Sequence, residues 1–248
     1  VQATRAIRAV EGLGVPTVKP WNLELIREKM DLVKDSGAFA VAMDVDAAGL
    51  PFLKGMEPPA GSKTVEQLKE IREMAGRPFI VKGVMTVKGA LKSLEAGADA
   101  IVSGAGLPLE LPALAEGFEA LLAPIVSSPR AAQLICRTWA KRYGRVPDFV
   151  VLEGCQAGGH LGFEEADLLA GRCAPLSQLI PQVLAALRPF EEKFGRAIPL
   201  FCAGGVATGA EMARCTRLGA AGAQMATRFI ATEECDASQG YKDVILAA

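Results

Sequence analysis

His160 is the only histidine of the 248-residue chain, and it follows the small residues Gly158 and Gly159. An imidazole titrates near neutral pH, so it can accept or donate a proton during a reaction. The two glycines have no side chains, so the backbone here can lie close to a planar ligand. A lone histidine is often structural, but its position in a glycine-rich loop after an apolar strand favours a proton-transfer role.

A second group of residues has the pattern of an anion site. Gly204 and Gly205 follow one short apolar strand, and Ala226 and Thr227 close the next one. Glycines allow backbone N–H groups to approach an anion, and a helix beginning near Gly209 adds the positive end of its dipole. The alternative is that both turns need small residues only for a tight connection. We predict a phosphate here.

Two polar residues end strands in the first half of the chain. Lys82 follows the apolar run of residues 78–81, and Ser103 ends the run of residues 100–103 before a Gly-Ala-Gly sequence. A buried lysine needs an anionic partner. That partner is either an anionic group of a ligand, which makes Lys82 a binding residue, or Asp44, which makes it half of a structural salt bridge. The sequence leaves both readings open.

A regular fold is needed to bring these residues together, and the chain has a repeated strand–helix pattern that predicts one. Eight short apolar runs, each bounded by Gly, Pro or Asp, alternate with segments that have apolar residues at helical spacing, such as Leu23–Ser36, Thr64–Ala75, Thr86–Ala96 and Ala210–Leu218. The predicted strands are Val15–Lys19, Phe39–Asp44, Phe79–Gly83, Ala100–Ser103, Pro124–Ser127, Phe149–Glu153, Pro199–Ala203 and Gly222–Thr227.

Strict alternation of strands and helices indicates a parallel sheet of the α/β class. Eight units, and a length near the ~250 residues typical of this fold, predict a single eight-stranded parallel (β/α)8 barrel of the TIM type over residues 1–248. In that fold the active site lies at the carboxyl ends of the strands, and phosphate sits at the loops after strands 7 and 8. The residues singled out above follow strands, as the fold requires.

Charge and composition exclude several classes of function. The net charge is −1 and the chain has no polybasic run, so neither nucleic acid nor an anionic membrane is an expected partner. The six cysteines form no C-x-x-C pair and match no zinc spacing, so no metal is expected. We interpret them as small buried hydrophobes in the reducing cytoplasm.

From about residue 98 to its end, the chain resembles the nitronate monooxygenase family, which also includes flavin-dependent enoyl reductases. The matching stretches include IVSGAGLPLELP, RAAQLICRTWAKRYGRVPDFVVLEG, AGGHLGF and TRFIATEECDAS. The resemblance implies FMN as cofactor and a small-molecule substrate, with His160 as the catalytic base. It places the FMN phosphate on Gly204, Gly205, Ala226 and Thr227, although Ala226 stands where the family favours glycine.

Residues 14–100 resemble FMN-dependent α-hydroxy-acid dehydrogenases instead. The stretches VPTVKPWN, AVAMDVDAAGLPFLKG and PFIVKGVMTVKGALKSLEAGADAIV carry this second resemblance. It implies that Lys82, the lysine of the VKG motif, contacts the flavin pyrimidine. The two resemblances meet near Ala98–Ser103, so we interpret the chain as a possible chimera of two flavin barrels, joined at residue 100.

Three functions follow from these observations. The leading one is an FMN-dependent oxidoreductase that oxidises nitronates or nitroalkanes with O2. The second is an NAD(P)H-dependent flavin enoyl reductase, in which His160 donates a proton. The third is a chimeric barrel scaffold that binds FMN or phosphate without catalysis, because a working site must be held to about 0.5 Å.

Overall fold

The structure, a computed structural model, describes residues 2–46, 60–159, 162–235 and 237–247. The chain divides into two compact units. Unit 1 comprises Val1–Ser103, Leu114–Leu121 and Phe229–Ala248, and unit 2 comprises Gly104–Ala113 and Leu122–Arg228. The single domain expected over residues 1–248 stays a prediction.

The strands of unit 1 pair in parallel and in chain order. They are β1 (Thr17–Val18), β2 (Val41–Asp44), β3 (Phe79–Val84) and β4 (Ala100–Ser103). Every residue of β2 and β4 is buried, as expected for parallel strands covered on both faces. The first predicted strand was too long, because Pro20 has no N–H to continue the hydrogen-bond ladder.

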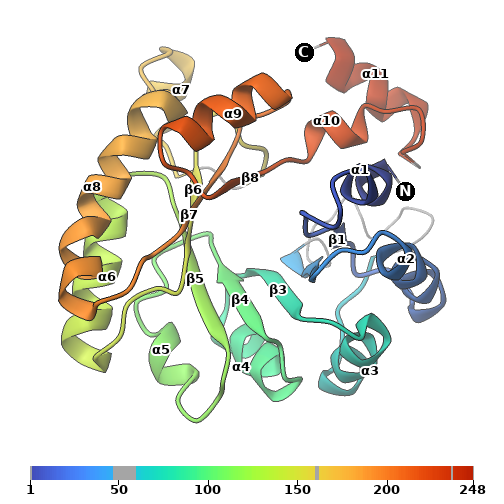
Figure 1. The fold of residues 1–248 in the computed structure, drawn as a ribbon, viewed down its shortest axis with the longest axis horizontal. Coiled ribbons are helices and arrows are strands. Elements are labelled where there is room, and N and C mark those ends of the chain that lie inside the picture. The colour runs from blue at the N-terminus through green and yellow to red at the C-terminus, as the bar shows by residue number, and fades with distance from the viewer. Residues whose placement is uncertain (1, 47–59, 160–161, 236, 248) are drawn as a thin grey trace. The chain divides into compact units, whose positions relative to one another are not determined.

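The helices of unit 1 lie outside these strands (Figure 1). They are α1 (Gln2–Ala9), α2 (Leu23–Asp35), α3 (Val65–Ala75), α4 (Val87–Glu95) and α11 (Gln239–Ala247). Residues just before three of them cap the first turn: Asn22 accepts from the amide of Leu25, Thr64 from Gln67 and Thr86 from Gly89. Such caps satisfy amides that have no partner inside the helix, which fixes where each helix begins.

In unit 2, β5 (Leu121–Val126), β6 (Val150–Glu153), β7 (Leu200–Ala203) and β8 (Gly222–Gln224) are again parallel neighbours in chain order. The last predicted strand ended too late. Ala226 lies outside any helix or strand, and Thr227 begins the short helix α10 (Thr227–Ile230). Thr227 is therefore at a helix start, where a backbone amide has no partner within the helix.

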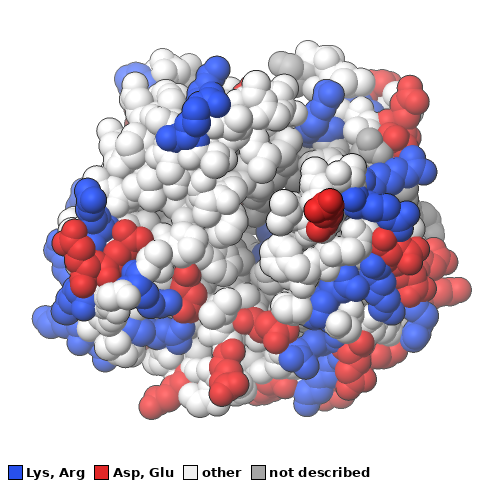
Figure 2. All heavy atoms as spheres, in the orientation of Figure 1, with Lys and Arg blue, Asp and Glu red and all other residues white. Residues whose placement is uncertain are grey.

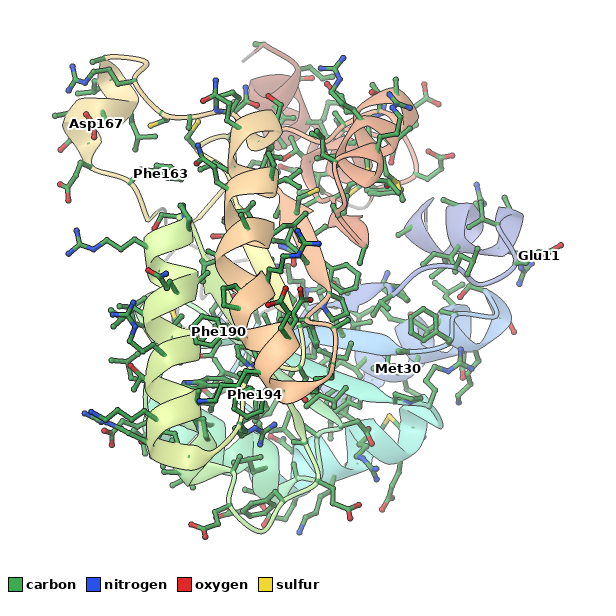
Figure 3. The ribbon with its side chains drawn as sticks, turned by 60° about the vertical axis from the view of Figure 1, so that its left-hand side comes forward. Glu11, Met30, Phe163, Asp167, Phe190 and Phe194 are labelled. Carbon is green, nitrogen blue, oxygen red and sulfur yellow. The ribbon has the colours of Figure 1, made fainter. Side chains whose placement is uncertain are left out.

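The other helices are α5 (Leu111–Leu114), α6 (Pro129–Tyr143), α7 (Glu165–Leu169), α8 (Leu176–Phe194) and α9 (Gly209–Arg217). Helix α6 lies beside α8, and Phe190 and Phe194 project from α8 in this region (Figure 3). Buried Trp139 of α6 donates its indole N–H to the carbonyl of Pro108 at 3.0 Å. Phe163 and Asp167 lie on the segment that connects β6 to α8, beyond the end of α6 (Figure 3). This packing holds the ends of β6 and β7 in place.

The eight parallel strands and their helices confirm the predicted (β/α)8 class. Acidic and basic side chains alternate over the helices on the face shown in Figure 2, so neither sign dominates there. Within the described part of the chain, no helix is both long and apolar enough to cross a membrane.

Candidate functional site

The turn after β7 has a backbone that only glycine adopts without strain. Gly204 and Gly205 have φ angles of +91° and +75°. A Cβ on Gly204 would lie 2.6 Å from the amide nitrogen of Ala157, in the turn after β6. A side chain at Gly205 would meet the amide oxygen of Gln156. Close packing between the two turns therefore explains these glycines in part, and the simpler alternative from the sequence holds to that extent.

The same turn presents backbone amides without an internal partner. Among the described residues, none accepts a hydrogen bond from the N–H of Gly205, Val206 or Thr227. Val206 is 7% exposed, so its amide is not an ordinary solvated loop amide. Buried amides almost always have an acceptor, so this arrangement suits an external one such as a phosphate oxygen.

The helix expected to contribute its dipole to that anion is already capped. Glu211 accepts hydrogen bonds from the amides of Ala207 and Thr208 at 2.9 and 2.8 Å. The amides of Ala207 and Thr208 keep the pKa of Glu211 below its usual range. These two amides are therefore not free to bind the phosphate, and the expected contribution of the α9 dipole stays a prediction. Thr208 and Glu211 have the spacing of a capping box, a signal that the sequence contained and our prediction missed.

Gly158 and Gly159 follow β6 and are exposed. A Cβ at either position would meet no atom of the described residues within 4 Å, and Gly159 has a φ of +94°. Unlike Gly204, these glycines border open space, so the structure leaves room for a ligand beside them. His160, the predicted proton-transfer residue, lies outside the described residues.

Ala226 and Thr227 follow β8 and are both exposed. The strands β6, β7 and β8 are direct neighbours, so their carboxyl ends lie along one edge of the sheet in unit 2. The structure thus gathers the predicted residues Gly158, Gly159, Gly204 and Gly205, with the pair 226–227, in one unit. Ser103 and Lys82 belong to unit 1.

Unit 1 carries a network of charged side chains at the ends of β1, β2 and β3. The carboxylate of Asp44 accepts a hydrogen bond from Lys19 Nζ at 2.7 Å, and Lys82 Nζ lies 3.1 Å from its other oxygen. That second contact is an ion pair without hydrogen-bond geometry, and Oδ1 of Asp44 has no hydrogen-bond partner. Asp44 is 8% exposed. The salt bridge that the sequence left open for Lys82 is therefore present.

Asp46 extends the network by hydrogen bonding to Asp44. Burial, the hydrogen bond and the charge of Asp44 raise the pKa of Asp46 to about 6. Burial alone would raise the pKa of Asp44. The hydrogen bond from Asp46 and the charges of Lys82 and Lys19 outweigh burial and lower this pKa to about 2. Below a pH of about 6 the two carboxyl groups thus share one proton, with Asp46 as the donor.

Two further residues of unit 1, Gly83 and Ser103, also bear on the candidate site. Gly83 has a φ of +74°, and a Cβ there would lie 2.8 Å from Asp46 Cγ and 2.9 Å from Asp44 Oδ1. The lack of a side chain at Gly83 therefore lets the two carboxyl groups approach. The hydroxyl of Ser103, predicted to bind the cofactor, donates to the carbonyl of Val84 at 2.7 Å. This bond leaves only its acceptor lone pairs for a ligand.

Comparison with known proteins adds the family. The family model described as nitronate monooxygenase matches residues 57–248. A nitronate monooxygenase of Metarhizium robertsii is 39% identical over 102 residues, which make up 41% of this chain and 25% of that protein. A probable nitronate monooxygenase of Staphylococcus saprophyticus is 36% identical over 102 residues. The chain thus spans about a quarter of the length of the curated relatives it matches.

Solved structures give the same fold. FabK of Thermotoga maritima is 26% identical, with a TM-score of 0.57 over 76% of this chain and 55% of that one. A nitroalkane oxidase of Streptomyces ansochromogenes is 19% identical, with a TM-score of 0.60 over 96% of this chain and 72% of that one. At that identity the likeness supports the fold alone.

Proposed function

Because this chain belongs to the nitronate monooxygenase family, we propose that it is an FMN-dependent oxidoreductase that oxidises nitronates or nitroalkanes with O2. The observation that carries the proposal is the set of amides of Gly205, Val206 and Thr227, which have no acceptor among the described residues. A terminal phosphate offers the oxygen atoms that such a set of donors needs.

The residues present fit FMN at one end. The phosphate would be held by the turn of Gly204 and Gly205 and by the segment of Ala226 and Thr227, with no contribution from the two capped amides at the start of α9. Gly158 and Gly159 border open space, so a planar ring can approach their backbone. When bound, FMN supplies the redox chemistry, and the protein positions and polarises it.

The proton-transfer residue of this proposal is His160. A neutral imidazole would take the proton next to the nitro group, because its pKa lies closer to neutrality than those of the lysines and most carboxylates. This role rests on the family resemblance. So do the contacts of Lys82 and Ser103 with the cofactor, since both have partners within unit 1.

The experiment is a cofactor titration followed by a choice of reductant. The purified chain is dialysed against micromolar FMN, and the retained flavin is measured by absorbance. We expect a yellow protein that bleaches under anaerobic conditions on addition of propane-2-nitronate. Bleaching by NADPH alone would favour the flavin enoyl reductase, and retained FMN that neither compound bleaches would favour a binding scaffold. No retained FMN would overturn the cofactor proposal.

A composite origin for residues 14–100 is a second proposal. It is supported by the hydroxy-acid dehydrogenase resemblance of that segment and by a unit boundary after Ser103, near the predicted join. The family model begins at residue 57, inside the segment, which argues for a shared ancestry of the remainder. A match of residues 14–56 to hydroxy-acid dehydrogenases alone would favour the chimera, and a match to nitronate monooxygenases would refute it.

A further inference from the structure

Unit 2 contains two pairs of neighbouring cysteine thiols. Cys155 and Cys173 line the same pocket, and loss of solvation and Cys155 raise the pKa of Cys173; loss of solvation and Cys215 likewise raise the pKa of Cys202. All four are free thiols. The pairs differ in access, because Cys155 and Cys173 are half-buried whereas Cys202 and Cys215 are buried, at 0% and 7% exposed. Our sequence interpretation of the cysteines as buried hydrophobes is therefore wrong for Cys155 and Cys173, and also for the half-buried Cys235.

The accessible pair lines a pocket of about 370 Å³. The pocket lies between the turns after β6 and β7, the segment before α8 and helix α9. Gly205 and Val206, whose amides are proposed to hold the phosphate, line it as well, and so does Arg214. The pocket is large enough for a small organic molecule. Both thiols can therefore be reached by the same small reactant from the same side.

We propose that Cys155 and Cys173 form a thiol–disulfide exchange site that accepts a small-molecule disulfide and ends as an intramolecular disulfide. The thiolate of Cys155 attacks one sulfur of the small disulfide, whose S–S bond breaks and releases one small thiolate, which takes up a proton. Cys173 then loses its proton and attacks the Cys155 sulfur, releasing the second small thiol. Two protein thiols are oxidised by two electrons, and one small disulfide is reduced to two thiols.

The order of the two steps follows from the surroundings of Cys173. Loss of solvation raises the pKa of Cys173 most, and the neighbouring Cys155 raises it further. Asp167 also raises this pKa, whereas Arg172 lowers it. The raised pKa lowers the fraction of Cys173 present as thiolate, which suits the thiol that reacts second. The attacking species in exchange is the thiolate.

The new bond would tie together the two ends of the segment 155–173. That segment contains α7 and, in the sequence, Gly158, Gly159 and His160. Closing a loop restricts the conformations open to it. The consequence for the flavin site rests on the proposed function, whereas formation of the bond does not.

The test uses the reduced full chain and bis(2-hydroxyethyl) disulfide as the probe, followed by tryptic mapping without reduction. Cleavage at Arg145, Arg172, Lys193, Arg196, Arg214 and Arg217 puts Cys155, Cys173, Cys202 and Cys215 on separate peptides. We expect a linked pair of peptides joining Cys155 to Cys173, formed at least about tenfold faster than any link between Cys202 and Cys215. Cys235, a half-buried free thiol outside these two pairs, should react no further than the mixed disulfide.

Two variants make the outcome decisive. Cys173→Ser should leave Cys155 as a stable mixed disulfide, and Cys202→Ser, the matched control in the buried pair, should leave the link unchanged. Linkage of Cys202 to Cys215 at an equal rate, or mixed disulfides on Cys155 and Cys173 that never link, would overturn the proposal. Because Gly205 and Val206 also line this pocket, the reactions are run on the FMN-free chain, so neither result depends on whether the chain binds FMN.

Discussion

The strand ends of unit 1 and those of unit 2 use polar groups in opposite ways. In unit 1, Lys19 Nζ and Lys82 Nζ lie 2.7 and 3.1 Å from the carboxylate of Asp44, and Asp46 hydrogen-bonds to it. In unit 2, the amides of Gly205, Val206 and Thr227 have no acceptor within the described residues. The charges of unit 1 are paired with one another, although Oδ1 of Asp44 has an ion pair without a hydrogen bond, whereas the open donors of unit 2 need a partner from outside. The difference supports our proposal that unit 2 binds the ligand.

The largest expected effect comes from removing the catalytic base. Each unit contains one candidate for it, and the two can be compared by substitution. His160→Asn should lower turnover of a neutral nitroalkane by about 10²–10⁴-fold, the usual contribution of a positioned base. The loss should be much smaller with a preformed nitronate, which has already given up its proton. Asp46→Asn, which removes the carboxyl with a pKa of about 6 in unit 1, should leave both rates close to the parent.

Steady-state assays of both substrates at one pH decide the matter. If Asp46→Asn lowers turnover of the nitroalkane and His160→Asn does not, proton transfer belongs to unit 1 and the contrast between the units fails.

Removing the central carboxylate of unit 1 should cost almost as much, but in stability. Asp44→Ala leaves Lys82, whose side chain is 18% exposed, without its counter-charge. We expect the free energy of unfolding to fall by about 3 kcal/mol, toward the lower end for broken buried pairs because Lys19 is 45% exposed. Urea denaturation measures this. Glu70→Ala, which breaks the exposed pair with Arg27, should cost less than about 1 kcal/mol.

Gly83 tests the close approach of the two carboxyl groups. Gly83→Ala forces a side chain into a left-handed backbone and places its Cβ 2.8 Å from Asp46 Cγ. Gly76→Ala, at a φ of +59° with nothing within 4 Å, imposes only the backbone penalty of about 1 kcal/mol. We expect Gly83→Ala to cost about 1 kcal/mol more than this control. Equal costs would mean that the network relaxes freely.

The smallest effect is a slope in stability with pH. The folded chain keeps the proton of Asp46 up to a pH of about 6, whereas the unfolded chain releases it near 3.8. Since the folded state then binds more protons, the free energy of unfolding contributed by Asp46 falls as pH rises from about 4 to about 6, and is constant above that. Asp44 has the opposite slope below pH 4. Asp46→Asn should flatten the curve between pH 4 and 6, and an unchanged slope would contradict the shared proton.

The eight strands could be predicted because each is a short apolar run, and buried parallel strands have that pattern. The residues at which the strands end could be predicted less well. Pro20 shortens the first strand, and Thr227 turned out to begin a helix, because hydrogen-bond partners decide boundaries and the pattern does not contain them. The capping of α9 by Glu211 was readable from the T-x-x-E spacing.

The contacts between residues distant in sequence could not be predicted. The spacing of the cysteines does not predict that Cys155 lies near Cys173, because this depends on the path of the segment that connects β6 to α8. The salt bridge of Lys82 was one of two readings, and only the register of β2 against β3, which pairs Asp44 with Lys82, chooses it. For the glycines, the sequence did not distinguish Gly204, which packs against Ala157, from Gly158, which borders open space.

The most direct test of the central claim is FMN affinity at Thr227. This residue is exposed and begins α10, where an acidic side chain is compatible with the helix. Thr227→Glu places a carboxylate where the phosphate is proposed to bind, and Thr227→Gln has nearly the same shape without the charge. Fluorescence titration should show that Thr227→Glu weakens FMN binding by about tenfold or more, while Thr227→Gln stays close to the parent. Equal affinities for the two variants would contradict the assignment of the phosphate to unit 2.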